Sequence, residues 1–171
     1  HGVEVRPADV RTSDWDCTLE RRADAAPDPA LRLGLRLVKG LAEEAAQRLV
    51  AARARRQGHA FESAQQLTEQ ASLDRRSMGC LGALAGLGGH RHRAAWQVAG
   101  LETSLPILPE VRIAEGIPLL HAPCEGEDIV ADYAHTGLTL RRHPMAVLRD
   151  QLNARGFVDS ARLRSLTSGS N

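Results

Sequence analysis

The residues with the clearest chemical potential lie at one corner of the chain, at Lys39, Gly40, Leu41 and Ala42. Glycine reaches positive φ without steric cost, so Gly40 suits a chain reversal, and Leu41 would point back between two helices as an apolar plug. The first amides of a helix starting at Ala42 would lack partners within the helix, and the helix dipole favours an anion there. Lys39 adds positive charge just before the turn. The pattern predicts a helix–hairpin–helix that binds nucleic-acid phosphate through backbone amides.

A second interpretation of this corner stays open. Many helical hairpins turn at a glycine and bind no ligand, so the corner could be purely structural. Hairpins that hold phosphate usually carry a second glycine, and Ala42 occupies that place here. Its methyl group would obstruct the close approach of a phosphate to the backbone, so the contact would be weakened or lost.

The elements around the corner must position it. A helix follows from Ala42, because Leu41, Ala45, Leu49 and Ala52 recur at helical spacing and define one buried face. One tight turn of helix would come just before the corner. Val3–Val5 and Leu31–Leu35 suggest two short strands, which need helices packed on them to be stable.

Basic residues gather in the middle of the chain. Residues 31–100 hold 11 Arg and Lys against five Asp and Glu, a net charge of +6, whereas the whole chain carries +1. This distribution fits a surface that faces a polyanion, although a solvated helical surface in an arginine-rich protein looks the same. We predict phosphate contacts for Arg48 on the hairpin helix and for Arg91 and Arg93 at the start of a later helix.

More helices are predicted after the hairpin. The stretch 61–71 would bury Phe61, Ala64, Leu67 and Ala71, and the stretch from Ser72 would bury Leu73, Met78, Leu81 and Leu84. Residues 90–101 would form a further helix that contains Ala94, Trp96 and Val98. A glycine-rich turn over 84–89 separates the last two, so 73–101 would form a second helix–turn–helix unit. The expected fold is mainly α: a tandem helix–hairpin–helix, a two-stranded N-terminal β element and a helical C-terminal extension.

The C-terminal third has a different composition. Residues 102–125 are proline-rich and predict a linker. Three further helices are then predicted: Glu125–Ala134 with Ile129, Val130 and Tyr133 inward; one starting at His143-Pro144 with Met145, Leu148 and Leu152 inward; and a last one capped by Asp159 or Ser160. Proline is well tolerated in the first turn of a helix.

Several classes of function lack support in the sequence. No carboxylate pair suits two metal ions, and no nucleophile stands beside a plausible base, so we expect neither a catalytic residue nor a metal site. Residues 82–89 lack the Gly-Lys-Ser/Thr of a nucleotide loop. Three widely spaced cysteines indicate a reducing, cytoplasmic setting, and no apolar run predicts a membrane span. Without an initial Met, the chain is expected to be a piece of a larger protein.

Five stretches of the sequence carry a resemblance to a known family. They are HGVEVRPADV (1–10), SDWDCTLE (13–20), LRLGLRLVKGLAEEAAQRLVAAR (31–53), GHRHRAAWQVAGL (89–101) and DYAHTGLTLRRHPMAVLR (132–149). In this order they resemble the bacterial family-C DNA polymerases, the group of the DNA polymerase III alpha subunit. The resemblance is strongest to the error-prone branch, the translesion polymerase of the DNA damage-induced mutasome.

The resemblance implies a position within a longer DNA polymerase. Residues 1–30 would end the fingers region, 31–101 would be the tandem hairpin domain, and 126–171 would lead toward an oligonucleotide-binding barrel. The magnesium-dependent nucleotidyltransferase site would lie in a palm outside this chain, which would be inactive and need no cofactor of its own. The implied role is to grip duplex DNA behind that site, independently of sequence, during damage-induced repair and replication.

The resemblance also suggests protein partners. Replicative relatives carry a peptide for the sliding clamp after the hairpin domain, and the corresponding stretch here holds Leu105 and Ile107, with Glu102 where glutamine is usual. An interaction module that docks accessory mutasome subunits or the clamp is therefore the alternative function.

Overall fold

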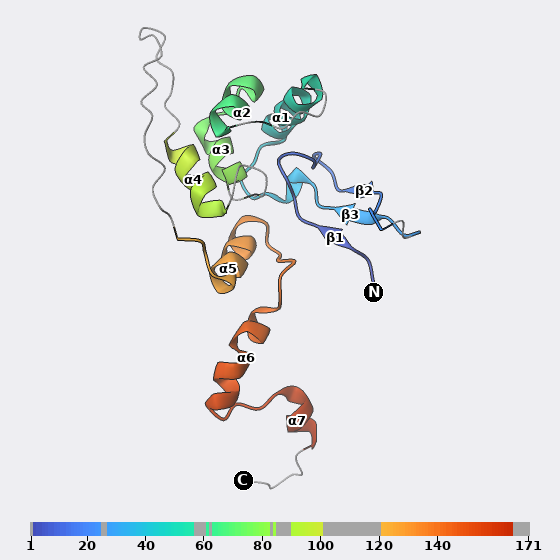
Figure 1. Cartoon of the computed structure of the whole chain (residues 1–171), viewed down its shortest axis with the longest axis vertical. Coiled ribbons are helices and arrows are strands. Elements are labelled where there is room, and N and C mark those ends of the chain that lie inside the picture. Colours follow the sequence, from blue (N-terminus) through green and yellow to red (C-terminus); the bar gives the residue numbers. More distant parts are fainter. Residues whose placement is uncertain are drawn as a thin grey trace. The chain divides into compact units, whose positions relative to one another are not determined.

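The computed structural model describes residues 2–24, 27–56, 61, 63–82, 84, 90–100 and 121–165. The chain divides into two compact units, His1–Leu140 and Arg141–Asn171. Figure 1 traces the elements from the small sheet through the helices that follow. The mainly helical fold agrees with the prediction, with one correction in the sheet.

The sheet has three strands rather than the two predicted. β1 (Val5–Arg6) lies parallel to β3 (Ala30–Arg32), and these two strands correspond to those that the sequence predicted at Val3–Val5 and Leu31–Leu35. β2 (Thr18–Glu20) pairs antiparallel with the other edge of β3, which gives the order β1-β3-β2. Three residues are too short to show an alternating pattern, so β2 is not evident from the sequence.

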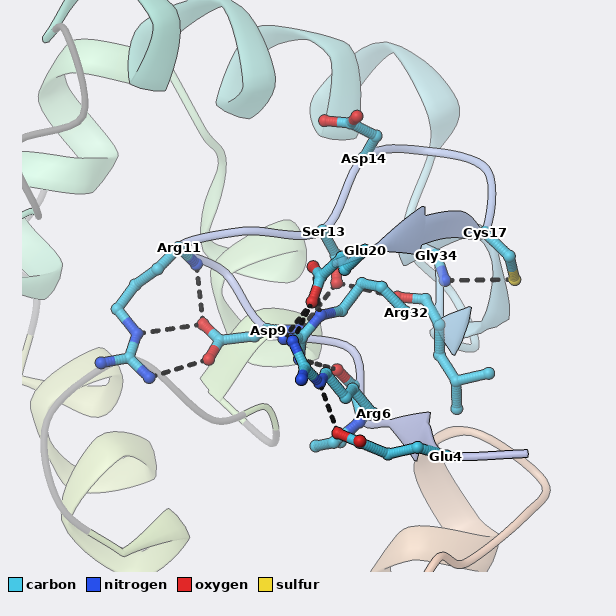
Figure 2. Close-up of polar contacts among 12 residues, drawn as sticks. Glu4, Arg6, Asp9, Arg11, Ser13, Asp14, Cys17, Glu20, Arg32 and Gly34 are labelled. Atoms are coloured by element: carbon cyan, nitrogen blue, oxygen red, sulfur yellow. Dashed lines mark hydrogen bonds and ion pairs between the residues drawn. The ribbon is translucent and has the colours of Figure 1, made fainter. Parts of the chain in front are cut away.

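A network of ion pairs covers one face of this sheet. Glu20 accepts hydrogen bonds from Nε and Nη2 of Arg32 at 2.8 and 2.9 Å and from Nη1 of Arg6 at 2.8 Å. Figure 2 shows the three side chains meeting over the strands. The hydrogen bonds from Arg32, followed by those from Arg6, lower the pKa of Glu20 against the opposing effect of burial. These contacts tie the three short strands together, because each strand contributes one member.

Helices make up the rest of the first unit. They are the 3₁₀ turn η1 (Leu35–Leu37), α1 (Glu43–Arg55), α2 (Ala64–Ala71), α3 (Arg75–Gly82), α4 (Arg91–Ala99) and α5 (Glu125–His135). The predicted apolar faces of α1, α2 and α3 are confirmed, and the largest fully buried side chains are Leu35, Leu49, Leu67, Met78 and Leu81. One core joins these helices to the loop before β2 through Ala8 and Val10.

The apolar residues of α4 and α5 are not all buried. On α4, Ala94 and Val98 form the buried stripe, and Trp96, which lies midway between them on the other side, is 48% exposed. On α5 only Ile129 is buried, whereas Val130 and Tyr133 are 70% and 42% exposed, so the inward prediction for these two residues was wrong. A short helix presents more apolar residues than one neighbour covers, and the sequence alone does not show which face is chosen.

The second unit contains α6 (Pro144–Ala154) and α7 (Ser160–Ser165). His143 caps α6, since its Nδ1 accepts a hydrogen bond from the Met145 amide at 3.2 Å, and Asp159 caps α7 by accepting from the Arg162 amide at 2.7 Å. No residue of α6 is buried in the part of the chain that the structure describes. The inward prediction for Met145 and Leu148 was therefore wrong. Both helices begin where the sequence predicted.

Candidate nucleic-acid interface

The first corner has the geometry that the sequence predicted. Gly40 adopts φ +82°, Leu41 is buried, and Ala42 is the extended residue that precedes α1. The Leu41 amide donates to the Val38 carbonyl at 3.2 Å, which closes the turn. Alanine has no side-chain acceptor, so the first amides of α1 receive no cap from it. Gly40 and Ala42 are exposed, and the corner therefore faces solvent rather than the core.

The SDWDC stretch holds α1 against the sheet. Arg53 of α1 donates from Nη1 to the Ser13 carbonyl at 2.8 Å and from Nη2 to the Asp14 carboxylate at 2.6 Å. The Ser13 hydroxyl donates to the Leu33 carbonyl at 2.8 Å, and the Gly34 amide donates to the Cys17 thiol at 3.3 Å (Figure 2). These bonds give structural roles to Ser13, Asp14 and Cys17 of the stretch. They position the hairpin, and none of them is a contact to a ligand.

The charges around the first corner are mixed. Glu43 and Glu44 stand exposed in the first turn of α1, where they already satisfy the helix dipole. The Lys39 side chain is exposed, but its ammonium donates to the Tyr133 carbonyl at 2.8 Å, and its amide donates to the His135 carbonyl at 2.8 Å. One amide and one cation at this corner are thus engaged by α5.

A second corner repeats the first at an interval of 32 residues. Ser72 is the one described residue other than glycine with positive φ, at +49°, and it occupies the place of Gly40. Leu73 is buried as Leu41 is, and the Met78 amide bonds to the Asp74 carbonyl as the Ala46 amide bonds to the Ala42 carbonyl. Further along the two helices, Ala45, Ala46 and Leu49 match Ser77, Met78 and Leu81, and all six are buried.

The second hairpin therefore joins α2 to α3. The sequence predicted it one helix later, at the glycine-rich turn over 84–89, of which only Leu84 is described. The signal that could have located it is the register: Gly40-Leu41 and Ser72-Leu73 each precede a matching apolar stripe by the same spacing. Serine in place of glycine conceals the corner, because serine rarely marks a left-handed residue.

The two corners differ in charge. Arg75 and Arg76 stand in the first turn of α3, where α1 carries Glu43 and Glu44. Asp74 supplies the cap that Ala42 lacks, and its carboxylate accepts a hydrogen bond from the Ser77 amide at 3.1 Å. Hydrogen bonding to Ser77 is the main cause of the lowered pKa of Asp74, and the nearby charge of Arg48 on α1 adds to it. The second corner is the more basic of the two.

Comparison with known proteins decides the family. Residues 2–94, more than half of the chain, match the profile described as a helix-hairpin-helix motif. The chain belongs to the helix–hairpin–helix family. It is also 53% identical to the error-prone DNA polymerase of Alkalilimnicola ehrlichii, 49% to that of Methylococcus capsulatus and 47% to that of Pseudomonas syringae pv. tomato. The alignments include 97–99% of this chain but only 16–18% of those polymerases.

The other predicted residues of this helix–hairpin–helix chain are in different environments. Arg48 and Arg93 are exposed, and neither forms an ion pair with any described residue. Arg91 instead pairs with Asp128 at 3.3 Å and is largely buried. Leu105 and Ile107 lie outside the described residues.

The described residues offer neither a metal site nor a membrane-spanning helix. No group of three or more His, Cys, Asp or Glu side chains in that part of the chain is placed to share a metal ion. None of its helices has both the length and the apolar character that crossing a bilayer requires.

Proposed function

We propose that this helix–hairpin–helix chain is a non-catalytic duplex-DNA-binding segment of an error-prone DNA polymerase, which grips phosphates independently of sequence behind the polymerase site. The observation that carries the proposal is the repeated corner. Gly40 and Ser72 both adopt positive φ and both are exposed. Each is followed by a buried leucine, Leu41 or Leu73, and then by the start of a helix. Two such corners can present backbone amides to two stretches of DNA phosphate backbone, and a duplex has two such backbones.

Exposed arginines on α1, α3 and α4 support phosphate rather than base recognition. Arg48, Arg76 and Arg93 are exposed, and none of them has an ion-pair partner among the described residues. Guanidinium groups bind phosphate through several donors, and that contact carries no sequence information. Gly40, Leu41 and Ala42 contribute backbone at the first corner, where the methyl group of Ala42 limits close approach. The second corner supplies the larger positive charge.

A titration at several salt concentrations tests this proposal. The chain is titrated with a labelled duplex, and the logarithm of the affinity is plotted against the logarithm of the salt concentration. The variant Arg48→Ala/Arg76→Ala should bind more weakly, with a slope reduced by about 0.9 for each lost phosphate contact. Arg21→Ala serves as the control, because Arg21 is exposed and distant in sequence from both hairpins. An unchanged slope in the double variant contradicts the proposal.

The wider role belongs to the longer protein. For the whole polymerase we propose magnesium-dependent nucleotidyl transfer, used in translesion synthesis after DNA damage. The proposed location of that polymerase is the cytoplasm. This chain alone is expected to be inactive in primer extension. Docking of accessory mutasome subunits or the sliding clamp remains the alternative. The test is a pull-down of the sliding clamp with the variants Leu105→Ala and Ile107→Ala. If both variants bind the clamp as well as the unsubstituted chain does, the proposed clamp contact is contradicted.

A further inference from the structure

Helix α5 is held at its C-terminal end by the first corner. The carbonyls in the last turn of a helix have no partner within the helix, and a cation there is favoured by the dipole. Lys39, the one lysine in the sequence, fulfils both requirements: its amide donates to the His135 carbonyl, and its ammonium donates to the Tyr133 carbonyl, each at 2.8 Å. The loop after α5 closes around the same side chain, since a β-carbon at Gly137 would lie 3.6 Å from Cε of Lys39.

The N-terminal half of α5 is held by α4. Nη1 of Arg91 lies 3.3 Å from the Asp128 carboxylate, and the two side chains are only 18% and 17% exposed. That Nη1 atom is buried and makes no hydrogen bond with the described residues, so Asp128 supplies the charge that compensates it. Nδ1 of His92 lies 3.1 Å from the carbonyl oxygen of His121, just before α5, and Ile129 of α5 is buried.

Helix α4 in turn packs against the second hairpin, which α2 and α3 form. It packs on α3, the helix that starts at the second corner, so closely that a β-carbon at Gly82 would lie 3.4 Å from Cγ2 of Val98. Helix α5 therefore contacts the first hairpin directly through Lys39, and it is linked to the second hairpin by way of Arg91 on α4. Both cations were predicted from the sequence to bind phosphate.

We propose that α5 is a clasp between the two hairpins, and that Lys39 and Arg91 are positioning residues for it rather than phosphate ligands. The clasp sets the spacing of the two corners. Its loss lets the corners move, so duplex affinity falls because preorganisation is lost. The number of phosphate contacts stays the same, and the salt dependence of binding is therefore unchanged. The effect on DNA rests on the proposed function, whereas the clasp itself does not.

Hydrogen exchange of the α5 amides tests the clasp directly. Lys39→Met and Arg91→Met keep most of the apolar stem and remove the charged group. Each should speed exchange over 125–135 by about tenfold, the change expected when one charge-assisted hydrogen bond or buried ion pair is lost. Arg93→Met is the matched control, because Arg93 lies two residues from Arg91 on α4, is exposed, and should leave α5 protected. The double variant Arg91→Asp/Asp128→Arg should restore protection.

The same variants are then titrated with duplex DNA at several salt concentrations. The clasp predicts weaker binding for Lys39→Met and Arg91→Met with the slope of the parent chain. Protected α5 amides in both variants overturn the clasp, and so does a slope reduced by about 0.9 in each, the signature of a lost phosphate contact. If the parent chain fails to bind duplex while α5 is released as expected, the proposed function is wrong and the clasp stands.

Discussion

Gly34 lies where the chain leaves β3 and passes against the backbone of the SDWDC stretch. A β-carbon at this position would lie 2.5 Å from the carbonyl carbon and 2.7 Å from the carbonyl oxygen of Asp16, with the carbonyl oxygen of Trp15 nearer still. Backbone atoms cannot move aside as the end of a flexible side chain can. The φ of Gly34 is −81°, which any residue adopts, so the cost of Gly34→Ala comes entirely from overlap.

The magnitude follows from the bonds that hold this contact. Separating the two segments strains the hydrogen bonds from the Leu35 amide to the Asp14 carbonyl at 2.8 Å and from the Arg36 amide to the Trp15 carbonyl at 3.1 Å. Losing two such bonds costs about 2–3 kcal/mol, and overpacking adds about 1–3 kcal/mol. Gly34→Ala should therefore destabilise the chain by about 3–6 kcal/mol, which lowers Tm by roughly 10 °C or more.

Thermal unfolding followed by circular dichroism measures this loss, and two other glycines provide controls. Gly79, in α3, has no atom within 4 Å of an added β-carbon, so Gly79→Ala should stabilise by up to about 1 kcal/mol through helix propensity. Gly40→Ala meets only the Cys80 sulfur at 3.4 Å but keeps φ +82°, which costs about 1–2 kcal/mol. A Gly34→Ala protein that melts with the parent chain, while Gly79→Ala behaves as expected, would refute the close approach.

Three further predictions concern the second corner and the sheet. Ser72→Gly should raise stability by about 1 kcal/mol in urea unfolding, because glycine adopts the observed φ of +49° without strain. Asp74→Ala should lower Tm by roughly 2–4 °C through the lost cap, yet duplex affinity should not fall with it, because the substitution removes a negative charge near Arg48. The pKa of Glu20 is lowered chiefly by Arg32, so its stabilising effect is complete above its ordinary value of 4.5 and is lost as the pH falls through the folded value. Urea unfolding from about pH 6 to pH 3 should therefore show a shallower acid loss for Glu20→Gln than for the parent chain, and equal slopes would contradict the role of this carboxylate.

The sequence by itself determined the elements whose causes are local. Gly40 marks a left-handed corner, and the spacing of Leu41, Ala45, Leu49 and Ala52 defines the buried face of α1, because helix geometry places those residues together wherever the helix lies. The same periodicity located the apolar stripe of α3. The family resemblance also followed from short stretches that the sequence shows directly.

Only the tertiary structure decided what depends on distant parts of the chain. Helical periodicity describes the faces that a helix offers but not the one that a neighbour covers, and so Val130 and Tyr133 were assigned inward although both are exposed. The use of a cation depends in the same way on its surroundings. Lys39 bonds to a carbonyl 94 residues away, and Arg91 pairs with Asp128 on another helix. The sequence shows only that a cation is present, and the fold decides whether it is paired and largely buried, as Arg91 is, or exposed, as Arg93 is.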